Sequence, residues 1–294
     1  MRKLGLVTVL YNSESVLKDF FASLKSQTLQ NFKLYLIDNS ASIESTHLLN
    51  TFLTEELLFE YEHIVCKGNL GVAEGNNIGI RKSIEDKCEF TVLLNNDIII
   101  ENTDFLAQLL NLHIKNEFDI IVPKIFYPDR KSIWYAGGYF DRLRALGVHR
   151  NFKKIDDNLS NCNQLVTYSP TCFMSIKNSV FDTVGLMDST YFVYTDDTDF
   201  VYRCIQLGIK LWYVPELVIT HLVSVSSGGD DSKFYIFYSN RNKIYFIRKH
   251  YTGIRKYISI GYHLLARVVF YLKFNSAQRQ SLLNGLREGF KLKL

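Results

Sequence analysis

Apolar runs of strand length alternate along the chain with segments in which apolar residues recur at helical spacing. In the first third, runs that are apolar at most positions predict strands at 4–11, 32–37, 60–65 and 90–95. Between the first two, apolar residues three or four apart predict a helix. Strands without a polar face are typical of parallel sheets covered by helices on both sides. The pattern therefore predicts an α/β fold with a mostly parallel central sheet flanked by helices.

The strand that begins near residue 90 ends in three polar residues, Asn95, Asn96 and Asp97, before a second apolar run. In parallel sheets ligands bind beyond the carboxyl ends of the strands, so these side chains are expected at the rim of a cleft. Asp97 is their only charge, and a carboxylate there suits a hard divalent cation, which prefers oxygen ligands and phosphate. The same residues are also typical of an ordinary turn, and this alternative stays open.

Glycine and asparagine crowd residues 68–79. Glycine lets a ligand approach the backbone closely, and asparagine offers both a donor and an acceptor, so the segment is a candidate ligand loop. It matches neither the dinucleotide-binding fingerprint nor a Walker phosphate loop, which disfavours both of those classes. A helix is expected to follow from about Asn76 to Lys87.

The second half is predicted to contain further strands and helices around an irregular excursion. The expected helices are 103–116, 179–185 and 198–207, and the expected strands are 119–123, 166–176, 211–215 and 218–221. The segment 126–167 is the least periodic of the chain and is expected to leave the sheet and shape a pocket. It contains Trp134, which could stack on a sugar or equally belong to the core.

Three acidic residues, Asp196, Asp197 and Asp199, lie within four positions beside aromatic residues. Carboxylates this close raise one another's proton affinity, so the cluster needs a cause. One or two of them suit a helix start, where acids favour the helix dipole. A neighbouring metal ion or a need for a general base would account for all three. His221 ends an apolar run and is more typical of a partly buried structural histidine than of a ligand.

Positive charge is concentrated at the carboxyl-terminal end. Residues 241–294 carry twelve Lys and Arg and one acid, whereas the rest of the chain has a net charge of −7. Within residues 254–272 apolar and basic residues fall on different faces, which predicts a basic amphipathic helix suited to an anionic membrane surface. A helix packed on the rest of the chain, or on a second subunit, is the alternative.

Other features narrow the class of protein. No run of 18 uncharged apolar residues predicts a transmembrane helix, and the first residues lack the features of a signal peptide. The five cysteines are odd in number and widely spaced, which indicates reduced thiols in a cytosol rather than a disulfide framework or a zinc site.

Five short motifs in this order resemble family 2 glycosyltransferases with the GT-A fold, especially the rhamnosyltransferase-like group of bacterial polysaccharide biosynthesis. The matching segments are 7–12, 36–40, 68–79, 94–97 and 196–199, together with His221. The resemblance covers about residues 3–222. It implies a catalytic domain at 1–230, with a nucleotide-binding half at about 1–100 and an acceptor half at about 101–230. A basic helical extension at 231–294 would follow.

The resemblance also implies roles for single residues. The nucleotide pocket would be formed by Thr8, Tyr11, Asp38, Asn69, Gly71, Asn76 and Asn96. A divalent ion, Mn²⁺ or Mg²⁺, would be held by Asp97, His221 and Asn95. The family has an Asp where Asn95 stands, which points to weaker or water-mediated metal contact. Asp197 would be the general base, with acceptor-side support from Asp196, Asp199 and Trp134.

Taken together, these features predict inverting, metal-dependent transfer of a sugar from a UDP- or dTDP-sugar to a hydroxyl of a lipid-linked or growing glycan. The expected location is the cytoplasm, peripheral at the inner face of the cell membrane, with the tail on anionic lipid. A homo-oligomer is compatible with the sequence, and nucleic acid is not expected as a partner.

Two other classes of protein remain as alternatives. A nucleotidyltransferase would need a phosphate loop with Lys or Arg after the first strand, and residues 11–15 offer none. A non-catalytic carbohydrate- or membrane-binding protein could keep the same fold. The intact Asp97, Asp197 and His221 argue against that loss of activity.

Overall fold

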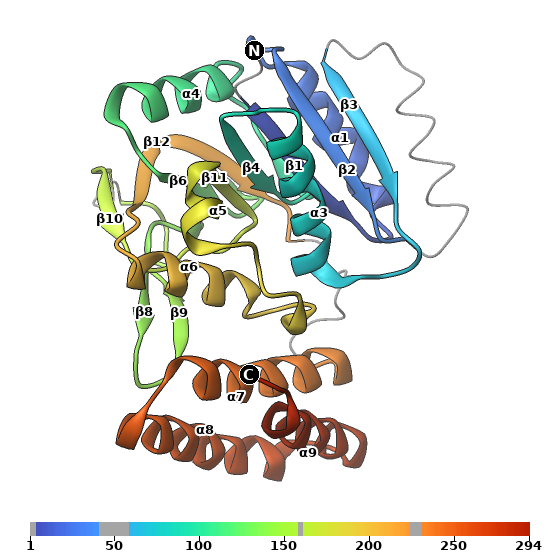
Figure 1. Cartoon of the computed structure of the whole chain (residues 1–294), viewed down its shortest axis with the longest axis vertical. Helices are drawn as coiled ribbons and strands as arrows, with labels where there is room; N and C mark the ends of the chain where they lie inside the picture. Colours follow the sequence, from blue (N-terminus) through green and yellow to red (C-terminus); the bar gives the residue numbers. More distant parts are fainter. Residues whose placement is uncertain (1–3, 41–58, 158–160, 224–230) are drawn as a thin grey trace.

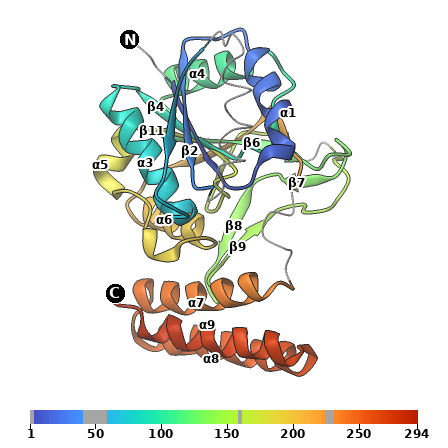
Figure 2. The ribbon, with the colours of Figure 1, turned by 90° about the vertical axis from the view of Figure 1, so that its right-hand side faces the viewer.

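The computed structural model describes residues 4–40, 59–157, 161–223 and 231–294. In this part of the chain a ten-stranded sheet forms the centre of the molecule, and the carboxyl-terminal helices form a layer at one end (Figure 1). Figure 2 shows helix α1 (Glu14–Lys25) and helix α3 (Gly71–Glu85) on opposite faces of that sheet. The α/β class with helices on both faces of a central sheet is therefore confirmed.

The amino-terminal half consists of parallel strands whose carboxyl ends meet at one edge. These strands are β1 Leu4–Leu10, β2 Phe32–Asp38, β3 Glu60–Val65 and β4 Phe90–Leu94. β1 pairs in parallel with β2 and β4, and β2 pairs in parallel with β3. Leu10 lies opposite Asp38, and the backbone N–H of Asn39 donates to the carbonyl of Leu10 at 2.9 Å. The βαβ arrangement that the sequence predicts is thus confirmed.

Helix α3 begins at Gly71, earlier than the expected start at Asn76. The reason is packing, because its glycines lie against the sheet. A Cβ at Gly75 would lie 2.8 Å from the side chain of Val9, and one at Gly79 would lie 2.2 Å from that of Val7. Much of the glycine pattern therefore serves close packing of a helix on β1 rather than a flexible loop.

The second half adds antiparallel strands to the sheet. In chain order its elements are β5 Ile98–Ile99, α4 Phe105–Asn116, β6 Ile120–Phe126, β7 Ile133–Tyr135, β8 Gly138–Asp141, β9 Leu146–His149, β10 Gln164–Val166, β11 Phe173–Lys177, α5 Ser179–Val184, the 3₁₀ helix η1 Ser189–Tyr191, α6 Asp196–Gln206 and β12 Leu211–His221. The order across the sheet is β10-β12-β6-β11-β4-β1-β2-β3. β11 runs antiparallel to β4 and β6, so the sheet is mixed.

Several boundaries differ from the prediction. The strand expected at 166–176 is two strands, β10 and β11, with Pro170 between them, where the missing N–H cannot continue a ladder. The two short strands expected at 211–221 form one strand, β12, with a register shift between Val214 and Val218. The excursion at 126–167 contains β7 and the β8–β9 hairpin, so it is more regular than its sequence suggests.

Three helices make the carboxyl-terminal layer: α7 Lys233–His250, α8 Gly253–Lys273 and α9 Ser276–Lys291. Glycines allow α9 to pack closely on α7. A Cβ at Gly285 or Gly289 would lie within 2.5 Å of an α7 carbonyl oxygen. Among the described residues, no helix combines the length and the apolar character needed to cross a membrane. The predicted division after residue 230 falls at the edge of residues 224–230, which lie outside the described part.

Candidate active site

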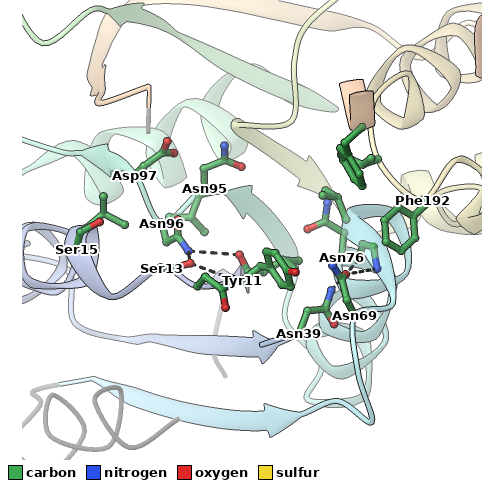
Figure 3. A pocket seen from close by; sticks show the side chains of 18 residues that line it. Tyr11, Ser13, Ser15, Asn39, Asn69, Asn76, Asn95, Asn96, Asp97 and Phe192 are labelled. Carbon is green, nitrogen blue, oxygen red and sulfur yellow. Dashed lines mark hydrogen bonds between the residues drawn. The ribbon is translucent and has the colours of Figure 1, made fainter. Parts of the chain in front are cut away.

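A cavity of about 630 Å³ lies beyond the carboxyl ends of β1 and β4 (Figure 3). One wall comes from the residues that follow these two strands, including Tyr11, Ser13 and the segment 95–97. The opposite wall comes from the start of α3 with Asn69, Gly71 and Asn76, and from Phe192, Val193 and Phe234. The cavity therefore lies at the sheet edge where the strand pattern places a ligand site.

Neutral amides dominate this cavity, and hydrogen bonds fix several of them. Asn69 accepts from the backbone N–H of Gly71 at 2.9 Å, and Asn39 donates to the Gly71 carbonyl at 2.9 Å. The side chain of Asn96 donates to the Ser13 hydroxyl at 2.6 Å. Because these groups are already held in place, little side-chain entropy would be lost when a ligand enters. An uncharged polar lining of this kind suits a sugar or a nucleoside.

Asp97 contributes the one charged side chain that the described residues place in the cavity lining, and it pairs with His221. A ring nitrogen of His221, Nε2, lies 3.1 Å from a carboxylate oxygen of Asp97 although 124 residues separate them. Both side chains are buried, and Nδ1 of His221 has no hydrogen-bond partner among the described residues. The edge of Trp134 packs on the same imidazole, with ring centres 4.6 Å apart.

The ligand atoms that Asp97, His221 and Asn95 offer decide whether they fit a divalent ion. The described residues contain no group of three His, Cys, Asp or Glu side chains that could hold a metal. Mg²⁺-type ions, however, are often held by one or two carboxylates together with substrate phosphates and water. Asp97, the buried imidazole of His221 and the amide oxygen of Asn95 fit a site of that kind, which is completed by its substrate.

Asp197 stands at the start of α6 in an environment different from that of Asp97. It accepts hydrogen bonds from the Tyr168 hydroxyl at 3.0 Å and from the backbone N–H of Thr198 at 2.6 Å. Burial raises the pKa of Asp197 above its ordinary value despite those hydrogen bonds. Burial, and then the charge of Asp197, raise the pKa of Asp196 to about 8. A carboxylate with a raised pKa is better matched to proton transfer near neutral pH.

The pKa of Asp199 shifts in the opposite direction, because basic side chains surround its carboxylate. Its fully buried carboxylate accepts from His250 at 2.6 Å, Arg203 at 2.8 Å and Lys249 at 2.8 Å, and from the Tyr191 hydroxyl at 3.0 Å. Burial raises the pKa of Asp199, but His250, Arg203 and Lys249 outweigh burial and hold that pKa well below its ordinary value. In this structure Asp199 joins α6 to α7.

A strained turn precedes these acids. Phe192 has a φ of 65° and a ψ of −60°, and the N–H of Val193 donates to the Tyr191 carbonyl at 2.7 Å, which makes a γ-turn of the rare, strained kind. The side chain of Asn242 on α7 donates to the carbonyls of Tyr191, Val193 and Tyr194 at 2.7 to 3.0 Å. The carboxyl-terminal helices thus hold the segment that forms one cavity wall and leads to the acids.

The cavity and the acid cluster meet at the start of β11. The carbonyl of Cys172 accepts from the N–H of Asn95 at 2.9 Å. Burial, followed by the charges of Asp97 and Asp197, raises the pKa of the Cys172 thiol well above its ordinary value. One buried thiol therefore lies within electrostatic range of both Asp97 and Asp197.

Most of the expected nucleotide residues line the cavity, but two do not. Tyr11, Asn69, Gly71, Asn76 and Asn96 are in the lining. Thr8 is fully buried in β1, and Asp38 is bound by the N–H of Ser40 at 2.8 Å and by His63 at 3.3 Å. Direct contact of Thr8 and Asp38 with a nucleotide stays a prediction.

Sequence reasoning missed part of the lining. Ser13 and Asn39 follow the first two strands, so their position after a strand end could have indicated them. Phe192 and Phe234 carry no such signal. Phe192 reaches the cavity through a strained turn of the predicted catalytic domain. Phe234 reaches it from the first turn of α7, which belongs to the predicted extension.

Comparison with known proteins supplies independent information. The family model described as Glycosyl transferase family 2 matches residues 6–185. The low-salt glycan biosynthesis hexosyltransferase of Haloferax volcanii is 24% identical over 248 residues, which are 82% of this chain and 74% of that protein. The dTDP-rhamnosyl transferase RfbF of Shigella flexneri is 28% identical over 224 residues, which are 75% of this chain and 69% of that protein.

The fold itself is similar to that of solved structures. The mannosyltransferase PcManGT of Pyrobaculum calidifontis, in complex with GDP-Man and Mn²⁺, superposes with a TM-score of 0.59 at 12% identity. The likeness covers 97% of this chain and 73% of that one. At this identity the comparison bears on the fold alone, and it confirms the expected GT-A architecture.

Gly71 offers a test of how tightly the cavity wall is built. Its φ is +82°, and a Cβ there would lie 2.4 Å from the carbonyl oxygen of Phe192. Gly71→Ala should therefore lower the free energy of unfolding by about 1–2 kcal/mol for the left-handed backbone and by about 1–3 kcal/mol more for overpacking. Gly68→Ala is the matched control, because Gly68 also has a positive φ but nothing within 4 Å. Equal losses in denaturant unfolding would show that the contact with Phe192 is unimportant.

Proposed function

Because this chain belongs to glycosyl transferase family 2, we propose that it moves a sugar from a UDP- or dTDP-sugar to a hydroxyl of a glycan acceptor, with inversion. One observation carries the proposal: the neutral, amide-lined cavity has Asp97 in its lining, and the charges of both Asp97 and Asp197 act on the same buried Cys172 thiol. Such an arrangement provides a donor site with one carboxylate for an ion and another for a proton. Polysaccharide or glycan synthesis is the setting that the rhamnosyl and hexosyl transferase relatives support.

For the donor, the amides and the Tyr11 ring supply contacts suited to a nucleoside. The relative named for dTDP-rhamnosyl transfer supports a dTDP-sugar, and a UDP-sugar is kept beside it. The cavity volume of about 630 Å³ is in the range of small-molecule sites. Trp134 packs against His221 and against the core, and its contact with a sugar or acceptor stays a prediction.

For the proton, Asp197 is the proposed general base. Inverting transfer requires one group to remove the proton of the acceptor hydroxyl as that oxygen attacks the anomeric carbon. Asp197 accepts hydrogen bonds from Tyr168 and Thr198, which orient its carboxylate. Asp196 beside it has a pKa raised to about 8 by burial and by Asp197, so a single negative charge on the pair is favoured near neutral pH. Asp199 contributes indirectly, because its ion pairs with Arg203 and Lys249 hold the start of α6 in position.

For the leaving group, Asp97, His221 and Asn95 are the proposed holders of Mn²⁺ or Mg²⁺. When bound, such an ion would neutralise charge that develops on the nucleoside diphosphate. Replacement of the family's first Asp by Asn95 lowers the negative charge of this site. We therefore expect weaker metal affinity than a site with two carboxylates would have.

The outer face of α8 supports a peripheral position on the inner face of the cell membrane. Ile254, Tyr257, Leu265, Val269 and Leu272 are each more than half exposed there. The helix carries four Lys or Arg and no acid, and the exposed Lys273 is one of them, so a net positive charge suited to anionic lipid accompanies the apolar face. The expected alternative, an apolar face packed on the rest of this chain, does not fit the exposure of these residues.

The base assignment predicts the behaviour of Asp197→Asn. This change should keep sugar-nucleotide binding, followed as thermal stabilisation, and lower turnover by roughly 10²–10⁴-fold, the usual effect of removing a general base. In the unaltered protein, turnover should be lost as pH falls through a pKa above the ordinary Asp value, because a protonated carboxyl accepts no proton. Asp182→Asn, an exposed acid on α5, is the control. Near-normal transfer by Asp197→Asn would move the role to Asp196.

The metal assignment predicts opposite effects at two neighbouring positions. Asp97→Asn removes the carboxylate of the cavity rim and should raise the Mn²⁺ concentration for half-maximal activity by about tenfold or more. Asn95→Asp adds a carboxylate and should lower that concentration. The measurement is a titration of activity with Mn²⁺ after treatment with EDTA. Full activity in excess EDTA would rule out a metal-dependent reaction.

The membrane assignment predicts salt-sensitive binding to vesicles. The full chain should sediment with vesicles that contain anionic phospholipid, and less so as salt rises, because each basic side chain near such a surface contributes about 1 kcal/mol. The double change Leu265→Ser with Leu272→Ser should abolish sedimentation. Leu294→Ser, also an exposed leucine but outside α8, should not. If the unaltered protein ignores these vesicles at low salt, the face belongs to an oligomer contact instead.

A further inference from the structure

Helix α8 packs with its polar side inward. Arg255, Ser259, His263 and Arg267 follow one another at intervals of four and therefore share one face. The buried residues of α8 are Ser259 and His263, whereas the large apolar side chains of the helix are exposed. A helix on a protein surface ordinarily turns its apolar face to the core. The interface behind α8 is therefore built from polar groups.

Several polar side-chain atoms in this interface have no hydrogen-bond partner among the residues that the structure describes. Nη2 of Arg255, Oγ of Ser259, Nε2 of His263 and Nε of Arg267 are buried and have no hydrogen-bond partner within the described part of the chain. Buried donors without acceptors are unfavourable, and more so when they are charged. The two arginine nitrogens can only donate, and the Ser259 hydroxyl and one tautomer of His263 can donate as well, so this helical face fits a group that accepts hydrogen bonds.

The surroundings of these donors are rich in positive charge. Lys243 of α7 donates to the carbonyl of Ala145 at the tip of the β8–β9 hairpin. Burial and the neighbouring charges of Arg267 and Arg144 lower the pKa of Lys243, and Asp197 and Asp141 raise it by less. Together they bring that pKa to about 7. Burial, then Arg267 and Lys243, lower the pKa of His263 to about 3. Cations therefore outweigh acids around this interface.

The two nearby acids are already engaged. Asp141 accepts from the backbone N–H groups of Leu143 and Arg144, each at 3.0 Å. Asp197 accepts from Tyr168 and Thr198. Lys243, Arg255 and Arg267 are half-buried and Arg144 is exposed, so the edge of the interface is open to solvent. Because the atoms without partners are themselves buried, an anion would have to enter at this edge and part the contacts between α8 and its neighbours.

We propose that the interface between α7 and α8 binds a phosphate or diphosphate group. Such a group has several acceptor oxygens and no obligatory donor, so it can accept from arginine, hydroxyl and imidazole groups that converge on it. The identity of the group that carries this phosphate rests on the proposed function. The charge of Asp197 acts on Lys243 at one side of this interface, and the exposed apolar side chains of α8 lie on the other side of that helix. A lipid-linked saccharide likewise carries its diphosphate between the saccharide hydroxyls and the lipid. The site would thus hold the diphosphate of the acceptor.

The test of the site itself uses inorganic pyrophosphate in EDTA, where the donor site holds no metal. Isothermal titration at low salt should detect binding to the full chain, and Arg267→Met should weaken it about tenfold or more, since a hydrogen bond from a charged group is lost. Lys273→Met removes the same charge from the exposed end of α8 and should leave binding unchanged. No binding, or equal binding by Arg267→Met, would overturn the site.

A folding readout separates a ligand site from a structural ion cluster. Because Nε of Arg267 is buried without a partner, Arg267→Met should leave the unfolding temperature unchanged or raise it when no anion is present. Pyrophosphate should then raise that temperature for the unaltered protein and not for the variant. A large loss of stability in Arg267→Met without anion would show that the arginine is structural, and would overturn the proposal.

Two further arms distinguish the source of the phosphate. Competition for pyrophosphate by phosphatidylglycerol vesicles would assign the site to a lipid headgroup, and no competition would assign it to a soluble or acceptor diphosphate. With a polyprenyl diphosphate saccharide as acceptor, Arg267→Met should raise the acceptor KM about tenfold and leave the donor KM unchanged. If no transfer is found at all, the proposed function fails, while pyrophosphate titration still decides on the site.

Discussion

The strained turn at residues 191–193 is the constraint on which the arrangement of this enzyme depends. A γ-turn with positive φ at Phe192 is unfavourable by itself, of the order of 1–3 kcal/mol, and persists only where the surroundings hold it. Asn242 holds it by three hydrogen bonds to backbone carbonyls, and the ion cluster of Asp199 fixes the helix that follows. One wall of the donor cavity and the orientation of Asp197 both follow from that turn. The carboxyl-terminal helices are therefore part of the machinery of the site.

The three clustered acids show how one motif can hold distinct physical roles. In sequence Asp196, Asp197 and Asp199 are equivalent carboxylates at a helix start. In the structure burial raises the pKa of the first two, whereas the hydrogen bond from His250 and the charges of Arg203 and Lys249 hold that of Asp199 low. Opposite shifts within four positions agree with the proposed proton transfer at Asp197 and with structural anchoring by Asp199. Environment, rather than residue type, makes that distinction.

Much of the fold could be predicted because its signals are local. Runs of apolar residues located β1 to β4, and the rule that ligands lie at carboxyl ends of strands located Asn96 and Asp97 correctly. The pairing of Asp97 with His221 could be expected only from resemblance, since no local pattern joins residues so far apart. The early start of α3, the γ-turn and the contribution of Phe234 could not be predicted. They depend on packing between elements that are distant in sequence.

Helix α7 touches both halves of the proposed reaction. Phe234 in its first turn lines the donor cavity, while Lys243 farther along the same helix faces α8 and lies within electrostatic range of Asp197. A helix that contacts two binding sites can couple their affinities, provided that the two ligands favour different positions of the helix. Any preference of a bound donor for one position of α7 is, by linkage, an equal change in the affinity of the other site for its own ligand. If two positions of α7 favour different ligands, occupation of one site changes the affinity of the other without any contact between the ligands.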